Sequence, residues 1–169
     1  MNVKVRYIFS RNKKIGSRLI SWGTKHLQPE VKPTASHVAI LVNEKYVFES
    51  TLETGIRVIT YKRWKQLNEE LYSVECIQDW TMQDLKDLYR PLKLKKYDYM
   101  GIVYFSYRIA LNILFKKPIP KINLFNHTDR YFCCEVISEM TGVSYEMTSP
   151  VELYYKLNGG IPNAKKEER

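Results

Sequence analysis

The chain has 169 residues, enough for one domain with a sizeable core, and 44% of them are hydrophobic, which argues against a disordered chain. Its formal net charge of +9 favours polyanionic partners such as anionic lipid, nucleic acid or an acidic cell-wall polymer. Three cysteines, two of them adjacent, do not make a disulfide framework and indicate a reducing compartment. No signal-peptide core or membrane-spanning run is visible, so we expect a cytoplasmic protein, with action outside the producing cell left open.

The first half of the chain predicts a block of strands after one short helix. Alternating apolar and polar residues predict a strand over 3–9. Apolar residues at helical spacing predict a helix over 15–22, and we expect Gly23 to end it. Four further strands are expected over 36–42, 45–50, 55–61 and 71–77.

The second half predicts mainly helices. Thr81 and Asp84 have the spacing of a helix N-cap, and Pro91 should end that helix near Arg90. Further helices are expected over 100–114, with Asp98 as its cap, 132–142 and 150–157. Residues 1–160 should therefore form a single α+β domain, an antiparallel sheet packed against helices, and residues 161–169 a flexible charged tail.

The two strands expected over 36–42 and 45–50 bring a histidine and a glutamate to one face of a hairpin. If residues 43–45 form a three-residue loop, Val42 pairs with Tyr46 and Glu49 lies diagonal to His37. A carboxylate there can accept a ring N–H of the histidine and fix its tautomer. A two-residue loop would move Glu49 to the opposite face, so this prediction depends on the turn.

A double cysteine opens the helix expected over 132–142. Free N–H groups and a partial positive charge at a helix N-terminus lower a thiol pKa and can stabilise an oxyanion. Cys133 has this position, and Cys134 points about 100° further round the helix, toward the core. With His37, Cys133 would form a thiolate–imidazole nucleophile. His127 is a second candidate base, and a metal site is disfavoured because adjacent cysteines lack the usual ligand spacing.

The order of the motifs resembles a known family. The motifs are Ser36-His37-Val38-Ala39-Ile40, Val47-Phe48-Glu49-Ser50, Gly55-Ile56-Arg57-Val58, Lys96-Tyr97-Asp98-Tyr99, Tyr131-Phe132-Cys133-Cys134-Glu135 and Ser149-Pro150-Val151-Glu152-Leu153. They are similar to the circularly permuted branch of the NlpC-type cysteine peptidases, the YiiX-like group with a permuted papain-like fold. The likeness extends to about Leu157, but the family's Gly-Asp before the first strand is absent, and Cys134 stands where the family has serine.

This resemblance implies a thiol hydrolase of bacterial or phage origin, with Cys133 as nucleophile, His37 as base and Glu49 as the acid that orients it. The bond would be an amide or acyl bond in a peptide, in peptidoglycan or in an acylated lipid, and no cofactor or metal is expected. Tyrosines near these motifs are candidates to contact substrate, although core packing is the commoner role for such rings. They are Tyr7, Tyr97 and Tyr131.

A second function class is a catalytically inert basic binding module that contacts nucleic acid, an anionic membrane or a partner protein. The apolar segment 99–115 is followed by Lys116, Lys117 and Lys121, a combination that suits an anionic membrane surface. A buried core helix with a basic loop is the alternative interpretation of that segment. The chain has no recognised nucleic-acid motif, and we expect a monomer.

Overall fold

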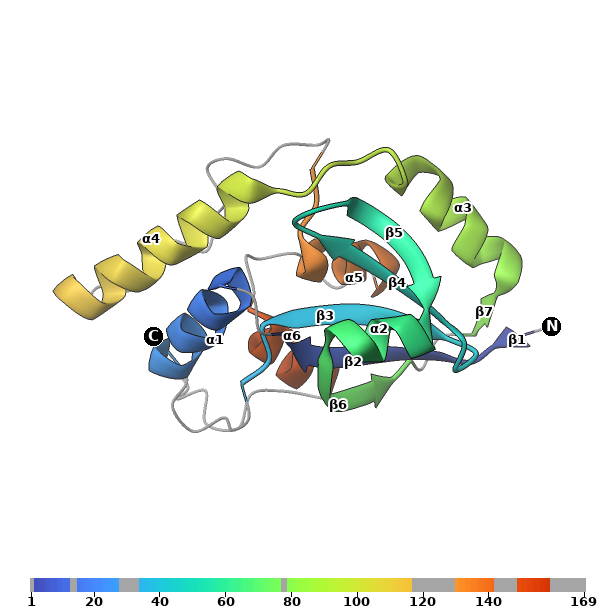
Figure 1. The fold of residues 1–169 in the computed structure, drawn as a ribbon, viewed down its shortest axis with the longest axis horizontal. Coiled ribbons are helices and arrows are strands. Elements are labelled where there is room, and N and C mark those ends of the chain that lie inside the picture. Colours follow the sequence, from blue (N-terminus) through green and yellow to red (C-terminus); the bar gives the residue numbers. More distant parts are fainter. Residues whose placement is uncertain are drawn as a thin grey trace, which may run out of the picture.

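The computed structural model describes residues 2–12, 15–27, 34–76, 79–116, 130–141 and 149–158. At its centre is a five-stranded antiparallel sheet in the order β5-β4-β3-β2-β6 (Figure 1). The strands of this sheet are β2 (Val5–Arg11), β3 (His37–Val42), β4 (Tyr46–Thr51), β5 (Gly55–Thr60) and β6 (Glu69–Glu75). Two short strands, β1 (Asn2–Val3) and β7 (Trp80–Thr81), pair separately.

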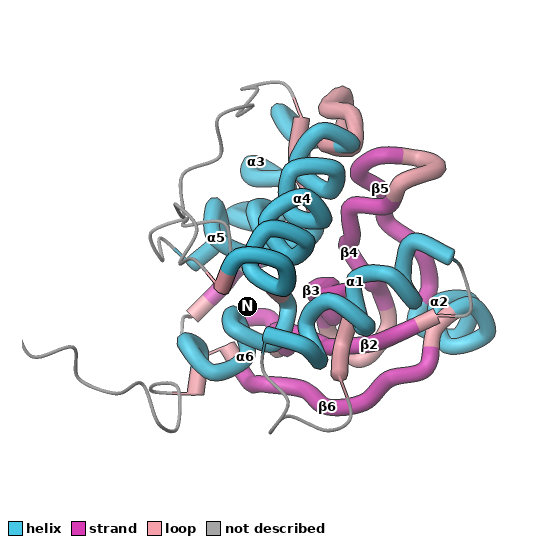
Figure 2. Tube along the Cα trace, turned by 90° about the vertical axis from the view of Figure 1, so that its left-hand side faces the viewer, coloured by secondary structure: helices cyan, strands magenta, loops and turns pink. Residues whose placement is uncertain are grey.

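Six helices surround the sheet in the part of the chain that the structure describes. They are α1 (Ile15–Leu27), α2 (Tyr61–Leu67), α3 (Met82–Leu92), α4 (Tyr99–Phe115), α5 (Cys133–Thr141) and α6 (Pro150–Leu157). Helices α3, α5 and α6 contribute to the core on one face of the sheet, and α2 contributes to the other. Helices α1 and α4 lie side by side, with α4 extending away from the sheet (Figures 1 and 2). The predicted α+β class, with an antiparallel sheet packed against helices, is confirmed.

Strand β3 is buried on both faces, which explains its continuous apolar sequence. Val38 and Ile40 belong to the larger apolar cluster, together with Val136 of α5. Ala39 and Leu41, which alternate with them, belong to a smaller cluster around a tryptophan of α2. His37, the first residue of β3, is only partly buried, unlike the five residues that follow it.

Two predicted helix ends are wrong. Helix α1 continues through Gly23, because a residue without a side chain lets α4 pack closely: a Cβ there would lie 2.1 Å from Cδ1 of Ile109. Helix α3 continues through Pro91 and ends one residue later, at Leu92. Its predicted start is confirmed, since Thr81 and Asp84 form a reciprocal capping box.

Helix α2 was not predicted, because the chain turns directly from β5 into it with Thr60 as its N-cap. Asp98 precedes α4 as predicted, but its side chain makes no capping hydrogen bond. The predicted tail over 161–169 lies outside the described residues. Within the described ranges, no helix combines the length and the hydropathy needed to cross a bilayer.

Candidate active site

The β3–β4 hairpin brings His37 and Glu49 into contact. Val42 pairs with Tyr46, so residues 43–45 form the three-residue loop and the predicted register is confirmed. As a result, Nε2 of His37 lies 2.8 Å from Oε2 of Glu49. This bond leaves Nδ1 of the ring for a second partner.

The carboxylate of Glu49 is held by more donors than the sequence suggested. Only 1% of its side chain is exposed, and its Oε1 accepts hydrogen bonds from Nε and Nη2 of Arg57 at 2.9 and 2.7 Å. Its Oε2 also accepts one from Nε1 of the fully buried Trp64 at 3.1 Å. Burial would raise the pKa of Glu49, but its bonds to His37 and Arg57 outweigh burial and lower it to about 2.

Arg57 and Trp64, which both donate hydrogen bonds to Glu49, were not predicted from the sequence as site residues. Arg57 carried a detectable signal, because it lies directly opposite Glu49 in the β4–β5 register. That register follows from the same strand pattern that predicted the hairpin. Trp64 gave no such signal, since its position depends on α2, an element that was not predicted.

Cys133 is the first residue of α5, and its thiol lies close enough to His37 for the imidazole to lower the pKa of the thiol. A hydrogen bond from Cys134 lowers the pKa of Cys133 most, burial opposes it, and His37 and the backbone N–H of Val38 add to the lowering. The net result is a Cys133 pKa well below its ordinary value. The charged thiolate is thus the favoured form of this side chain.

The two adjacent cysteines have different surroundings. Cys134 is completely buried, and burial together with the neighbouring Cys133 raises its pKa well above the ordinary value. The structure brings Cys133 to His37, whereas no such contact with the histidine is a cause of the pKa shift of Cys134. The pKa values of the two neighbouring thiols are thus shifted in opposite directions.

His37 completes a chain of three groups. Burial would lower the pKa of His37, but hydrogen bonds to Cys133 and Glu49 raise it to about 10. At neutral pH the ring is therefore an imidazolium, and it lies between the Cys133 sulfur and the Glu49 carboxylate. Such an arrangement can activate a sulfur nucleophile and donate a proton to a leaving group.

Hydrogen bonds connect the segment before α5 to the strand that carries Glu49. Ser50, the next residue on β4, donates from Oγ to the carbonyl of Tyr131 at 2.8 Å. The N–H of Tyr131 donates to the carbonyl of Lys96 at 3.0 Å. Gly55 permits this approach, because it has a φ of +64° and a Cβ there would lie 2.8 Å from the Lys95 carbonyl oxygen. These contacts position Cys133 relative to the hairpin.

A pocket of about 290 Å³ lies beside this cluster. His37, Glu49 and Tyr97 are among its lining residues, as are Arg57 and Arg63, and much of its surface is polar. Cys133 itself is only 5% exposed and is not among the residues that line this pocket.

The three candidate tyrosines differ in placement. Tyr97 is buried and lines the pocket, where burial and the charge of Cys133 raise its pKa. Tyr131 acts through its backbone and is not among the lining residues. Tyr7 packs in the core, where its hydroxyl lies 3.0 Å from Sγ of Cys76, so its placement does not support substrate contact.

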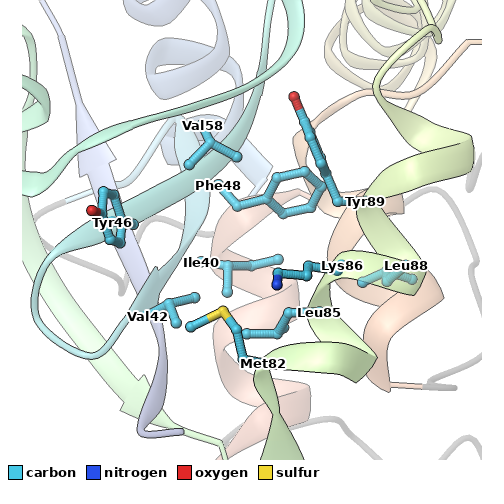
Figure 3. Close-up of a pocket in the computed structure, with 10 residues that line it drawn as sticks. All are labelled: Ile40, Val42, Tyr46, Phe48, Val58, Met82, Leu85, Lys86, Leu88 and Tyr89. Atoms are coloured by element: carbon cyan, nitrogen blue, oxygen red, sulfur yellow. The ribbon is translucent and has the colours of Figure 1, made fainter.

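A second pocket, of about 200 Å³, lies between the sheet and α3 (Figure 3). Its lining is almost entirely apolar, and Lys86 is its single charged side chain among the described residues. Its other lining residues are aliphatic or aromatic side chains and one methionine, and His37, Glu49 and Cys133 are not among them.

His127, Lys117 and Lys121 lie outside the described residues, and Lys116 follows the last residue of α4. Over the described ranges, no three histidine, cysteine or acidic side chains are grouped as metal ligands would be. Comparison with protein-family models, with curated proteins and with solved structures returned no significant match.

Proposed function

We propose that this protein is a cysteine hydrolase that cleaves an amide or acyl bond with Cys133, His37 and Glu49. The observation that carries the proposal is the hydrogen bond between His37 and Glu49, together with the closeness of Cys133 at the start of α5, whose pKa the imidazole lowers. The pKa of the thiol is lowered while that of the imidazole is raised, the combination that a nucleophile and its acid partner need.

The reaction proceeds in two steps. The Cys133 thiolate attacks the substrate carbonyl carbon, and the His37 imidazolium gives its proton to the departing amine or alcohol as the old bond breaks. His37, now neutral, takes a proton from water, whose oxygen attacks the thioester carbonyl and releases the acid. The thiolate and imidazolium are thereby restored, and Glu49 keeps the ring oriented throughout.

The start of α5 offers stabilisation for the negative oxygen of the tetrahedral intermediate. The first N–H groups of a helix have no partner within it, and Cys133 and Cys134 occupy the first two positions of α5. The N–H of Phe132, which lies just before the helix, already donates a hydrogen bond to Oε2 of Glu135 at 2.8 Å. We assign the N–H of Cys133 as the main oxyanion donor.

The polar pocket beside His37 favours a peptide-like substrate over an acylated lipid, because its arginine and amide side chains suit the polar groups of a peptide. Peptidoglycan stem peptides belong to this class. The permuted papain-like fold and the NlpC-type family remain part of the proposal, supported by motif order and by the meeting of Cys133 with His37.

Thiol labelling tests the proposal without knowledge of the substrate. Iodoacetamide at pH 6 should alkylate Cys133 at least about tenfold faster than Cys76, because only a thiolate reacts. His37→Gln should remove that advantage, while Cys134→Ser should keep a reactive Cys133. Equal rates at both cysteines in the folded protein would overturn the proposal and favour a binding module.

Acyl transfer is tested with p-nitrophenyl acetate. Intact-mass analysis should show one acetyl group on Cys133 during turnover, and release of p-nitrophenol should continue after it has formed. Cys133→Ser and His37→Gln should each abolish the acetylated species. Acetylation at the same rate in His37→Gln would show that the imidazole takes no part.

A further inference from the structure

Helix α4 exposes a continuous apolar stripe. Tyr99, Val103, Tyr107 and Leu114 lie on one side of the helix by their spacing, and they are 52%, 58%, 56% and 72% exposed. At the end of the helix, Phe115 is 62% exposed. Soluble helices normally turn such a stripe toward the core, so this face is unusual.

The buried side of α4 is a different one. Tyr104 and Ile109 are 6% and 4% exposed, and Ile109 packs against Gly23 of the neighbouring α1. The helix is therefore anchored through these residues, while the stripe faces outward. The alternative interpretation, a buried core helix with a basic loop, fits Tyr104 and Ile109 but not the exposed stripe.

The charge of the two paired helices is of a single sign. Together α1 and α4 contain no aspartate or glutamate, although the chain has 18 acidic residues elsewhere. Arg18 and Lys25 of α1 are exposed, and so is Lys116 directly after α4. An exposed apolar stripe with aromatic rings, on a pair of helices that carry exposed cations and no acidic residue of their own, is the composition of a surface that lies on an anionic bilayer.

We propose that α4, with the basic residues of α1 beside it, docks on the surface of a membrane containing anionic lipid. Helix α4 has 17 residues and is about 25 Å long, whereas a bilayer-spanning helix needs roughly 20 apolar residues. We therefore expect α4 to lie in the plane of the interface. A second copy of the chain is a less suitable occupant, because docking would bring like charges together. This inference is independent of the proposed hydrolase activity.

Vesicle sedimentation tests the inference with the full-length chain. The wild type should bind vesicles of phosphatidylcholine with about 30% phosphatidylserine and bind pure phosphatidylcholine far more weakly, with affinity falling as salt rises. Val103→Gln with Leu114→Gln keeps helix propensity and should reduce binding about tenfold or more. The control is Leu94→Gln, since Leu94 is 82% exposed but lies outside α4.

A charge variant separates the electrostatic part. Lys25→Glu with Lys116→Glu should reduce binding to anionic vesicles about tenfold or more, whereas Lys62→Glu on α2 should leave it nearly unchanged. Circular dichroism should show that each variant keeps its helices, and Cys133→Ser should bind as the wild type does.

Three results would overturn the inference. One is equal binding of wild type and stripe variant to anionic vesicles. Another is equal binding of the wild type to neutral and anionic vesicles. The third is a dimeric wild type by light scattering that becomes monomeric in the stripe variant, which would assign the stripe to a second copy.

Discussion

Replacing Glu49 with glutamine tests the buried hydrogen-bond network directly. The change keeps the shape of the side chain but removes its charge and turns one oxygen into a donor. In the wild type, Oε1 faces two N–H groups of Arg57, and Oε2 faces the rings of His37 and Trp64. In either orientation of the amide, its NH₂ group meets other donors, and buried groups are left without partners.

The size of the effect follows from two estimates that agree. Breaking a buried charged pair by removing one partner costs about 3–5 kcal/mol in the free energy of unfolding. Separately, the pKa of Glu49 is about 2 against an ordinary 4.5, which at 1.36 kcal/mol per pKa unit corresponds to about 3 kcal/mol. For a domain of this size, such a loss lowers the melting temperature by roughly 10 °C.

The pH dependence has a defined sign. Because folding lowers the pKa of Glu49, its contribution to stability is fully present above about pH 4.5 and is lost as the pH falls toward 2. Urea unfolding of the wild type and of Glu49→Gln should therefore differ by about 3 kcal/mol at pH 7, and the difference should shrink between pH 4.5 and 2.

A matched control separates this effect from the loss of any ion pair. Glu69 pairs with Arg11 at the surface, where its side chain is 59% exposed, so Glu69→Gln should cost less than about 1 kcal/mol. Alkylation of Cys133 should slow in Glu49→Gln alone, because His37 loses its carboxylate. The reasoning is refuted if Glu49→Gln costs no more than the control, or if its cost is the same at pH 3 and pH 7.

Further predictions concern the site and its supports. The ring resonances of His37 should not titrate between pH 5 and 8 in NMR spectra, because its pKa is about 10, and a midpoint near 6.5 would contradict this. Gly23→Ala should lower the free energy of unfolding by about 1–3 kcal/mol, because the new Cβ would clash with Cδ1 of Ile109. Adding Ile109→Val removes that atom and should recover much of the loss in thermal melts. No recovery would argue against the contact. Ser50→Ala should slow alkylation of the site thiol at a stability cost of about 1 kcal/mol, whereas Thr81→Ala, which removes a helix cap of similar strength, should leave that rate unchanged.

Local patterns were sufficient for several parts of the molecule. The β3–β4 register followed from alternation and turn length, and it alone predicted the contact of His37 with Glu49. The capping box at Thr81 was also visible, because both of its partners lie within one helical turn. Features of this kind depend on hydrogen bonds between residues close in sequence, so the sequence displays them directly.

Tertiary structure decided the features that join distant segments. Trp64 reaches Glu49 only because α2 packs on the sheet, and α1 passes through Gly23 only because α4 lies against it. The outward stripe of α4 likewise depends on which side of the helix is anchored. In each case the free energy comes from burial and contact between remote elements, and no window of neighbouring residues contains that term.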